Sequence, residues 1–289
     1  MDILYIVGNF SKCDDWEFRF SLRSIDKFGE NIGRVFLCGY CPDWLSDDVI
    51  KIPYEIIPYT TAGEKNRNIY KQIIYAVENT DIGINDDGDF LISMDDHYIL
   101  NYVDFGSSYP HYIKNYTKRQ CKFNLPLVFE KGKQSPDYQR ILLSTAKFLK
   151  RNYLTHLNFT PHRNIRVNRY AIEELQNNGI NYDIFNNNID IEGIALAVNY
   201  EYTVKSKNNF VIEIIKDFKT NDVDKLLKYI EDEGVFYSTN DFSVNDEVFN
   251  ALYSLFPGKS KYEKDVDEIL LDEKEDEFVD MTSESNFSF

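Results

Sequence analysis

Long apolar runs are missing and cysteines are few in this sequence of 289 residues. Apolar runs such as Ile3 to Val7 fall far short of the roughly 20 residues that cross a bilayer, so we expect no transmembrane helix. The acidic second residue and the short first apolar run differ from a secretory signal, which favours a cytoplasmic protein. Four cysteines do not make a disulfide framework in a chain of this length, and we expect reduced thiols.

Two of the cysteines, Cys38 and Cys41, have the CxxC spacing of redox pairs and of half a zinc site. The sequence contains no second CxxC, and its four histidines are not spaced around this one. We therefore expect two structural thiols here. A redox pair or a zinc site is the alternative.

Positive charge is scarce, because 32 Lys and Arg stand against 48 Asp and Glu and the formal net charge is −16. Nucleic-acid affinity rests largely on Lys and Arg that neutralise phosphates, so this balance argues against a broad nucleic-acid surface. Half of the net charge lies in residues 264–289, which hold ten acids and two lysines. Even without that segment, the rest of the chain is not basic.

The segment 264–289 is polar and has few apolar anchors, so we expect a disordered acidic tail. It ends in Asn286-Phe287-Ser288-Phe289. Acidic tails with terminal aromatic residues can dock a protein partner, and a tail that only keeps the protein in solution is the alternative.

Strand and helix patterns alternate along the first hundred residues. Strands are predicted at Ile3 to Val7, at Arg34 to Leu37, within Val49 to Ile57 and at Phe90 to Met94, with helices after Asp15 and over Lys65 to Val77. This alternation predicts an α/β fold with a mainly parallel sheet that helices cover on both faces. Further helices are predicted over Pro136 to Tyr153, Tyr170 to Asn178, Asp222 to Glu233 and Val244 to Phe256, with a polar loop over residues 160–169.

The strand Phe90 to Met94 ends in two adjacent carboxylates, Asp95 and Asp96, followed by His97. In open α/β sheets, ligands collect outside the carboxyl ends of the strands. Magnesium and manganese prefer oxygen ligands and keep places for substrate phosphate oxygens. The pattern therefore predicts a divalent cation that carries a diphosphate, and a solvated acidic turn is the alternative.

Four segments of the first hundred residues resemble those of a known family. They are Asp2 to Tyr5, Trp16 to Ile25, Cys41 to Leu45 and Phe90 to Asp96. Their order and spacing resemble the first two conserved regions of Stealth-type sugar-phosphate transferases and of short GT-A glycosyltransferase-like proteins, many of them from phages. Weaker similarities lie in Thr160 to His162, Asn187 to Asp190 and Phe256 to Glu263, and Met94 stands where the family has asparagine.

The resemblance implies a GT-A-like, mixed but mainly parallel sheet and a site for a nucleotide-activated sugar with a divalent cation. We expect a catalytic domain over residues 1–205, a helical extension over 206–263 packed on it, and the tail 264–289. If the chain is phage-encoded, its location is the host cytoplasm.

For the cation, Mn²⁺ or Mg²⁺, the resemblance implies Asp96 as the first ligand and Asp95 as its helper. Such a cation would neutralise the charge on the leaving nucleotide. His162 is the preferred later ligand, and His156 is a second candidate. His97 is either a ligand or a hydrogen-bonded neighbour of the acids.

Donor-binding candidates lie at several places along the chain. They are Val7, Gly8, Asn9, Arg19, Lys65, Asn68, Asp95, Arg163, Arg166, Lys259 and Ser260. Arg163 and Arg166 can grip phosphate with their planar forks, or they are solvated in a surface loop. The resemblance of Phe256 to Glu263 to a closing segment of some GT-A glycosyltransferases implies that Lys259 and Ser260 fold over the diphosphate as a lid.

Catalytic candidates are Asp190 and Glu192, because the base of an inverting enzyme must be a carboxylate that reaches the acceptor hydroxyl. A retaining enzyme needs no such base. Arg23 is the third candidate. It shares a helix face with Arg19, and salt bridges to Glu17 or Asp26 are the alternative for both arginines.

The leading hypothesis is a metal-dependent glycosyltransferase that moves a sugar from a nucleotide-sugar donor to an acceptor hydroxyl. The acceptor is either a surface glycan or a hydroxymethylated base in phage DNA, since fold-level analogy does not identify it. Sugar-1-phosphate transfer of the Stealth type is the first alternative. A non-catalytic protein that binds nucleotide or carbohydrate on a degenerate GT-A scaffold is the second.

Overall fold

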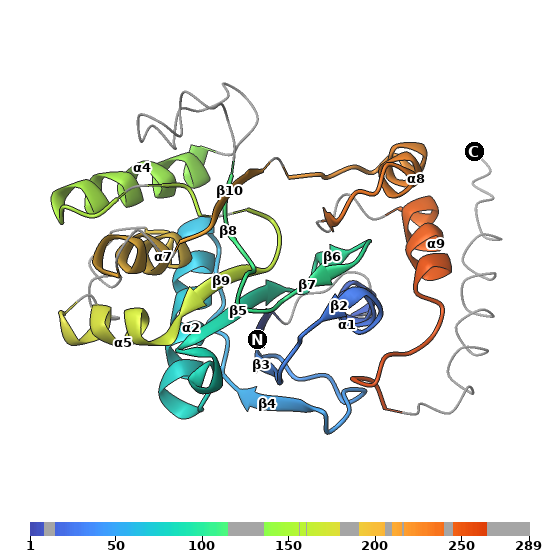
Figure 1. Ribbon diagram of the computed structural model, residues 1–289, viewed down its shortest axis with the longest axis horizontal. Coiled ribbons are helices and arrows are strands. Elements are labelled where there is room, and N and C mark those ends of the chain that lie inside the picture. Colours follow the sequence, from blue (N-terminus) through green and yellow to red (C-terminus); the bar gives the residue numbers. More distant parts are fainter. Residues whose placement is uncertain are drawn as a thin grey trace, which may run out of the picture.

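A five-stranded sheet of order β4-β3-β1-β5-β9 forms the centre of the protein (Figure 1). The computed structural model describes residues 1–8, 15–114, 136–155, 157–159, 161–179, 191–205, 210–215, 217–239 and 245–264. The parallel strands are β1 (Asp2–Val7), β3 (Val35–Gly39), β4 (Val49–Pro53) and β5 (Asp89–Met94), and β9 (Ile165–Asn168) runs antiparallel to β5. The prediction of a mixed, mainly parallel sheet flanked by helices is confirmed.

Both faces of β1 are buried, which explains why its sequence is continuously apolar. Leu4 and Ile6 belong to one core cluster, whereas Ile3, Tyr5 and Val7 belong to the other. This division follows from the alternation of side chains along a strand. The sheet therefore separates two cores, each closed by its own helices.

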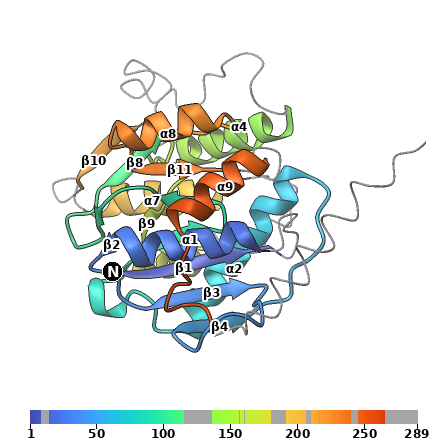
Figure 2. The same cartoon turned by 90° about the vertical axis from the view of Figure 1, so that its right-hand side faces the viewer.

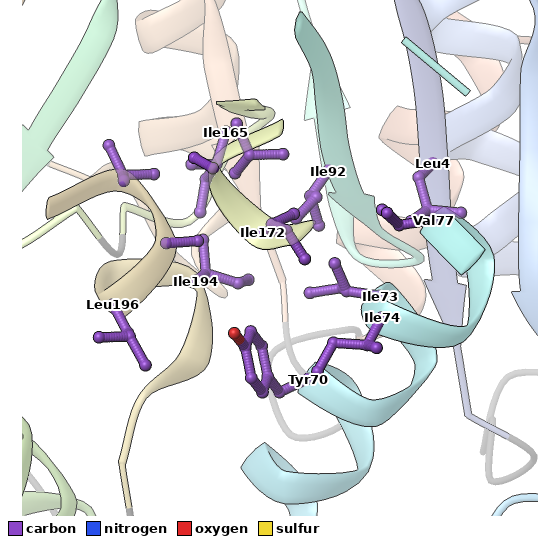
Figure 3. Packing of buried hydrophobic residues seen from close by; sticks show 14 of the residues in the cluster. Leu4, Tyr70, Ile73, Ile74, Val77, Ile92, Ile165, Ile172, Ile194 and Leu196 are labelled. Atoms are coloured by element: carbon purple, nitrogen blue, oxygen red, sulfur yellow. The ribbon is translucent and has the colours of Figure 1, made fainter. Parts of the chain in front are cut away.

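The first core lies under α2 (Ala62–Asn79), α4 (Pro136–Arg151), α5 (Arg169–Asn177) and α7 (Gly193–Val204). In Figure 3, Tyr70, Ile73 and Ile74 of α2 face the side chains of α5 and α7 across this core. A capping box of Thr61 and Glu64 starts α2, which places its first turn before the predicted start at Lys65. Gly193 lies so close to α2 that a Cβ atom there would come within 2.2 Å of the Tyr70 ring.

The second core lies under α1 (Trp16–Phe28), which has buried side chains on two sides. Phe18, Leu22 and Ile25 pack on the sheet, whereas Phe20 packs on the C-terminal part of the chain. Figure 2 shows α1 between the sheet and α9 (Asp246–Leu255). Because α1 packs against the sheet on one side and against the C-terminal part of the chain on the other, it has apolar residues on two faces.

The C-terminal part of the chain, residues 217–239 and 245–264, packs on the side of α1 that faces away from the sheet. It does so through α8 (Val223–Glu231), β11 (Phe236–Ser238) and α9. β11 pairs antiparallel with β6 (His97–Ile99), the strand that follows the two acids. The remaining elements are β2 (Gly29–Glu30) with β7 (Val103–Asp104), β8 (His111–Lys114) with β10 (Ile212–Ile215), and the 3-10 helix η1 (Ile84–Asp86).

The predicted strands and helices all occur within a few residues of their expected bounds, with one correction. The polar loop predicted over residues 160–169 is wrong for Ile165–Asn168, which form β9 at the edge of the sheet. Lys264 was assigned to the tail, but its backbone N–H donates to the Trp44 carbonyl. The rest of the tail lies outside the described residues. Among the residues that are described, no helix combines the length and apolar character that a membrane crossing needs.

Candidate functional site

The candidate site lies at the carboxyl edge of the sheet, where β1, β3 and β5 end side by side. The register pairs Val7 with Gly39 and Ile6 with Met94. Gly8 and the acid pair Asp95-Asp96 are the next residues along their strands. From β1 the chain passes to β3 on one side and later to β5 on the other, so the strand order reverses beside β1. Ligands of open α/β sheets bind at this kind of position.

The ends of β1 and β3 differ in how closely they are packed. Among the described residues, and apart from its own chain neighbours, no atom lies within 4 Å of the position that a Cβ atom on Gly8 would take. Gly39 has a φ of +123°, and a Cβ atom there would meet the Val7 carbonyl oxygen at 2.3 Å, so this position requires glycine. Tyr40 follows with its side chain 40% exposed and its N–H bonded to Val7.

Negative charge is concentrated at the end of β5. Burial, with smaller contributions from the charges of Asp96 and Glu17, raises the pKa of Asp95 to about 8, whereas Lys65 acts in the opposite direction. Glu17 lies in the first turn of α1 and is only 4% exposed. Carboxylates that are held together against their repulsion favour a bound cation.

His97 lies behind Asp96, with its Nε2 atom 3.6 Å from Asp96 Oδ1. The Met94 backbone N–H donates to its Nδ1 atom, which assigns the proton to Nε2. Burial lowers the pKa of His97 to about 3, and the charges of Lys219 and Arg163 contribute in the same direction. A neutral imidazole whose N–H faces the carboxylate can orient Asp96, so the geometry favours the role of neighbour.

His162 lies near the site, but it does not form a cluster of possible metal ligands with Asp95 and Asp96. Its ring lies edge-on to that of His97, with 6.3 Å between the ring centroids, and its backbone N–H donates to Asp217. In the part of the chain that the structure describes, no three His, Cys, Asp or Glu side chains are grouped so that they could hold a metal. The acid pair instead fits a cation that takes its other ligands from water and phosphate.

Arg19, Arg23 and Ser260, which were predicted to bind donor or act in catalysis, all bond to Glu263. Arg23 Nε and Nη2 lie 2.7 and 2.8 Å from its two carboxylate oxygens, and Arg19 Nη1 lies 2.9 Å from one of them. Ser260 donates to the same carboxylate through its N–H and its hydroxyl. These contacts fasten residues 256–264 to α1. They favour a fixed strap over the predicted lid, which also included the exposed Lys259.

Arg163 and Arg166 lie in different surroundings, and neither is solvated in a loop. Arg163 is 6% exposed, and its guanidinium lies over the rings of Tyr112 and Phe236, at 4.7 and 4.2 Å from their centroids. Arg166 bonds to Asp89 and to two backbone carbonyls. Since Asp89 is the first residue of β5 and the acid pair follows its last, Arg166 lies at the far end of the strand from the site.

Of the remaining predicted residues, some make structural hydrogen bonds and others lie outside the described residues. Glu192 caps α7 by accepting the Ala195 N–H, and burial raises its pKa to about 7. Asn68 donates to the Ile57 carbonyl and holds the loop before α2. Asn9, His156 and Asp190 lie outside the described residues. Cys38 and Cys41 are free thiols, and burial raises the pKa of Cys38 to about 12, which suits a structural role.

No protein-family model matches the chain, and no curated protein matches it significantly. The resemblance to Stealth-type and GT-A proteins therefore rests on the four segments named above and stays a prediction.

Three residues at this edge were not found from the sequence. Glu17 carried a signal, because an acid in the first turn of the helix after β1 lies near the end of that strand. Tyr40 carried a weaker one, as the residue after β3. Thr239 carried none, because only the pairing of β11 with β6 brings it to the acids.

One buried acid lies away from the edge and gives a prediction on stability. Glu201 of α7 is 4% exposed, and no described residue hydrogen-bonds to its Oε2 atom. Burial raises its pKa from 4.5 to about 8, with Asp89 contributing in the same direction. Between these pH values the unfolded chain releases a proton that the folded protein keeps, so the free energy of unfolding falls as the pH rises.

We expect Glu201→Gln to raise the free energy of unfolding by about 2–3 kcal/mol at pH 8, because the amide removes the cost of the buried charge. At pH 4.5 the gain should largely vanish. Urea unfolding at both pH values measures the difference, with exposed Glu231→Gln as the matched control. An equal gain at both pH values would show that burial of the charge is not the cause.

Proposed function

We propose that the protein is a metal-dependent glycosyltransferase that uses a nucleotide-sugar donor. The observation that supports this most directly is the position of Asp95 and Asp96. They follow β5 at the carboxyl edge, beside the end of β1 and at the reversal of strand order. Burial and the charges of Asp96 and Glu17 raise the pKa of Asp95 although Lys65 acts against them, so the positive charge nearby does not balance these carboxylates. A divalent cation with a diphosphate supplies that charge and fits the position.

In this proposal each residue at the edge has a distinct task. Asp96 binds Mn²⁺ or Mg²⁺, and Asp95 assists it. The cation, when bound, stabilises the negative charge that develops on the departing nucleotide. Gly8 allows the diphosphate to approach the backbone closely, and Lys65 at the start of α2 attracts it. Tyr40 offers an exposed ring on which the base can stack.

The proposal is tested with a panel of nucleotide sugars, each with and without Mn²⁺ or Mg²⁺. A donor that binds the folded state should raise the melting temperature only when the cation is present. Turnover should release a nucleoside diphosphate. Release of a nucleoside monophosphate would instead show sugar-1-phosphate transfer, the second candidate that the resemblance suggests.

The acceptor is tested in the same assay, with surface glycans in one arm and DNA that contains hydroxymethylated bases in the other. Incorporation of labelled sugar identifies the acceptor class. Donor binding that never leads to turnover with any acceptor or with water would favour the binding-protein alternative. If no nucleotide sugar binds with either cation, the proposed function is wrong.

A further inference from the structure

Thr239 joins three elements at the acid pair. It directly follows β11 and is fully buried. Its backbone N–H donates to the Asp96 carbonyl oxygen at 3.2 Å. Its hydroxyl donates to Glu17 Oε1 at 3.3 Å and lies 2.8 Å from the Tyr98 hydroxyl oxygen. A residue of the C-terminal part thus contacts the acid turn, β6 and α1 at once.

The donor and the acceptor can be assigned in each of these two hydroxyl hydrogen bonds. A threonine hydroxyl has one proton, and here that proton goes to the carboxylate of Glu17. The Tyr98 hydroxyl must then donate to Thr239. A tyrosine hydroxyl keeps its proton near neutral pH and can donate it to a second hydroxyl. The result is a directed chain from Tyr98 through Thr239 to Glu17.

This chain matters for the acids because the position of a carboxylate determines how well it binds a cation. Glu17 is buried beside Asp95 and raises the pKa of that residue. The Thr239 hydroxyl holds one oxygen of Glu17, while its N–H holds the backbone of Asp96. Partners that orient metal-binding groups in this way commonly change metal affinity by about 10–100-fold when they are removed.

We propose that Thr239 is a positioning residue through which the C-terminal part of the chain sets the geometry of Glu17 and of the Asp95-Asp96 turn. This inference rests on the proposed function, because it assumes that the turn binds a divalent cation. Thr239 touches no substrate in this role. It acts through the residues that it holds, across 143 positions of sequence from Asp96.

The test is the dissociation constant of Mn²⁺ alone, measured by titration on the full chain. Thr239→Val keeps the shape of the side chain but removes the hydroxyl, and it should weaken Mn²⁺ binding about tenfold. Thr239→Ser keeps the hydroxyl and should bind Mn²⁺ within about threefold of wild type. Thr203→Val is the matched control, because it also removes a hydroxyl that bonds within the fold, on α7.

The possible outcomes test the role of Thr239 separately from the proposed function. If wild type binds Mn²⁺ and Thr239→Val binds it equally well, Thr239 is only structural and this inference is wrong, even if the variant melts earlier. If wild type binds no Mn²⁺, this inference fails by itself, because the donor panel with Mn²⁺ or Mg²⁺ tests the proposed function separately. If Thr239→Val does not fold, Tyr98→Phe removes the donor to the same hydroxyl and should weaken Mn²⁺ binding in the same direction. An unchanged constant there also contradicts the inference.

Discussion

Replacing Asp96 with asparagine should reduce Mn²⁺-dependent turnover by at least about 100-fold, because the amide is a poor ligand for a hard cation. The same change should hardly affect the fold. Asp96 stands beside Asp95 and near Glu17, and removing one charge relieves their repulsion. We therefore expect the melting temperature without metal to stay within a few degrees of wild type. Asp96→Asn should therefore lower turnover strongly and leave the melting temperature nearly unchanged.

Donor turnover and thermal melting of the same preparation measure the two effects together. Asp224→Asn is the matched control, since Asp224 is an exposed carboxylate on α8. Melting with excess Mn²⁺ adds a direct test of the ligand assignment, because a cation that binds only the folded state stabilises wild type more than Asp96→Asn. If Asp96→Asn keeps full turnover while Asp95→Asn loses it, the roles of the two acids are reversed.

The different expectations for turnover and stability follow from where the acids lie. A folded protein rarely gains stability from adjacent carboxylates that are partly withdrawn from water, since desolvation and repulsion both disfavour their charge. Their presence at the carboxyl edge of β5 is thus hard to explain by folding alone. Functional sites commonly keep such unfavourable groups, and the same groups often limit stability.

The central sheet could be predicted because its signals are local. β1 and β5 are short apolar runs bounded by polar residues, and α2 has clear helical periodicity. β9 was missed because Arg166 and Asn168 interrupt its apolar residues and make it resemble a loop. Its place in the sheet depends on pairing with β5, a contact that no local pattern shows.

The site was predicted only in part, because some of its residues depend on contacts between distant parts of the sequence. Asp95 and Asp96 could be placed from the end of one strand, without knowledge of the rest of the fold. The roles of Arg19 and Arg23 depend on Glu263, which lies 240 residues after Arg23. The helix spacing correctly put both arginines on one face, but it pointed to nearby acids as the alternative partners.

Replacing Arg23 with methionine should lower the free energy of unfolding by about 3–5 kcal/mol, the second large effect that we expect. The Arg23 side chain is 8% exposed and that of Glu263 is 1% exposed. Burial alone would raise the pKa of Glu263, but the hydrogen bonds from Arg23 and Ser260 lower it, so the acid is charged in the folded protein. Without Arg23, only Arg19 and Ser260 are left to compensate that buried charge.

The double variant Arg23→Met/Glu263→Met separates a structural role of Arg23 from a catalytic one. Because it removes both buried charges, it should regain much of the stability that Arg23→Met loses. Arg19 then loses its partner as well, but its guanidinium still lies over the Trp44 ring at 4.1 Å. If Arg23 is structural, the double variant should also regain donor turnover. A double variant that is stable but inactive would restore the catalytic role that the sequence predicted for Arg23.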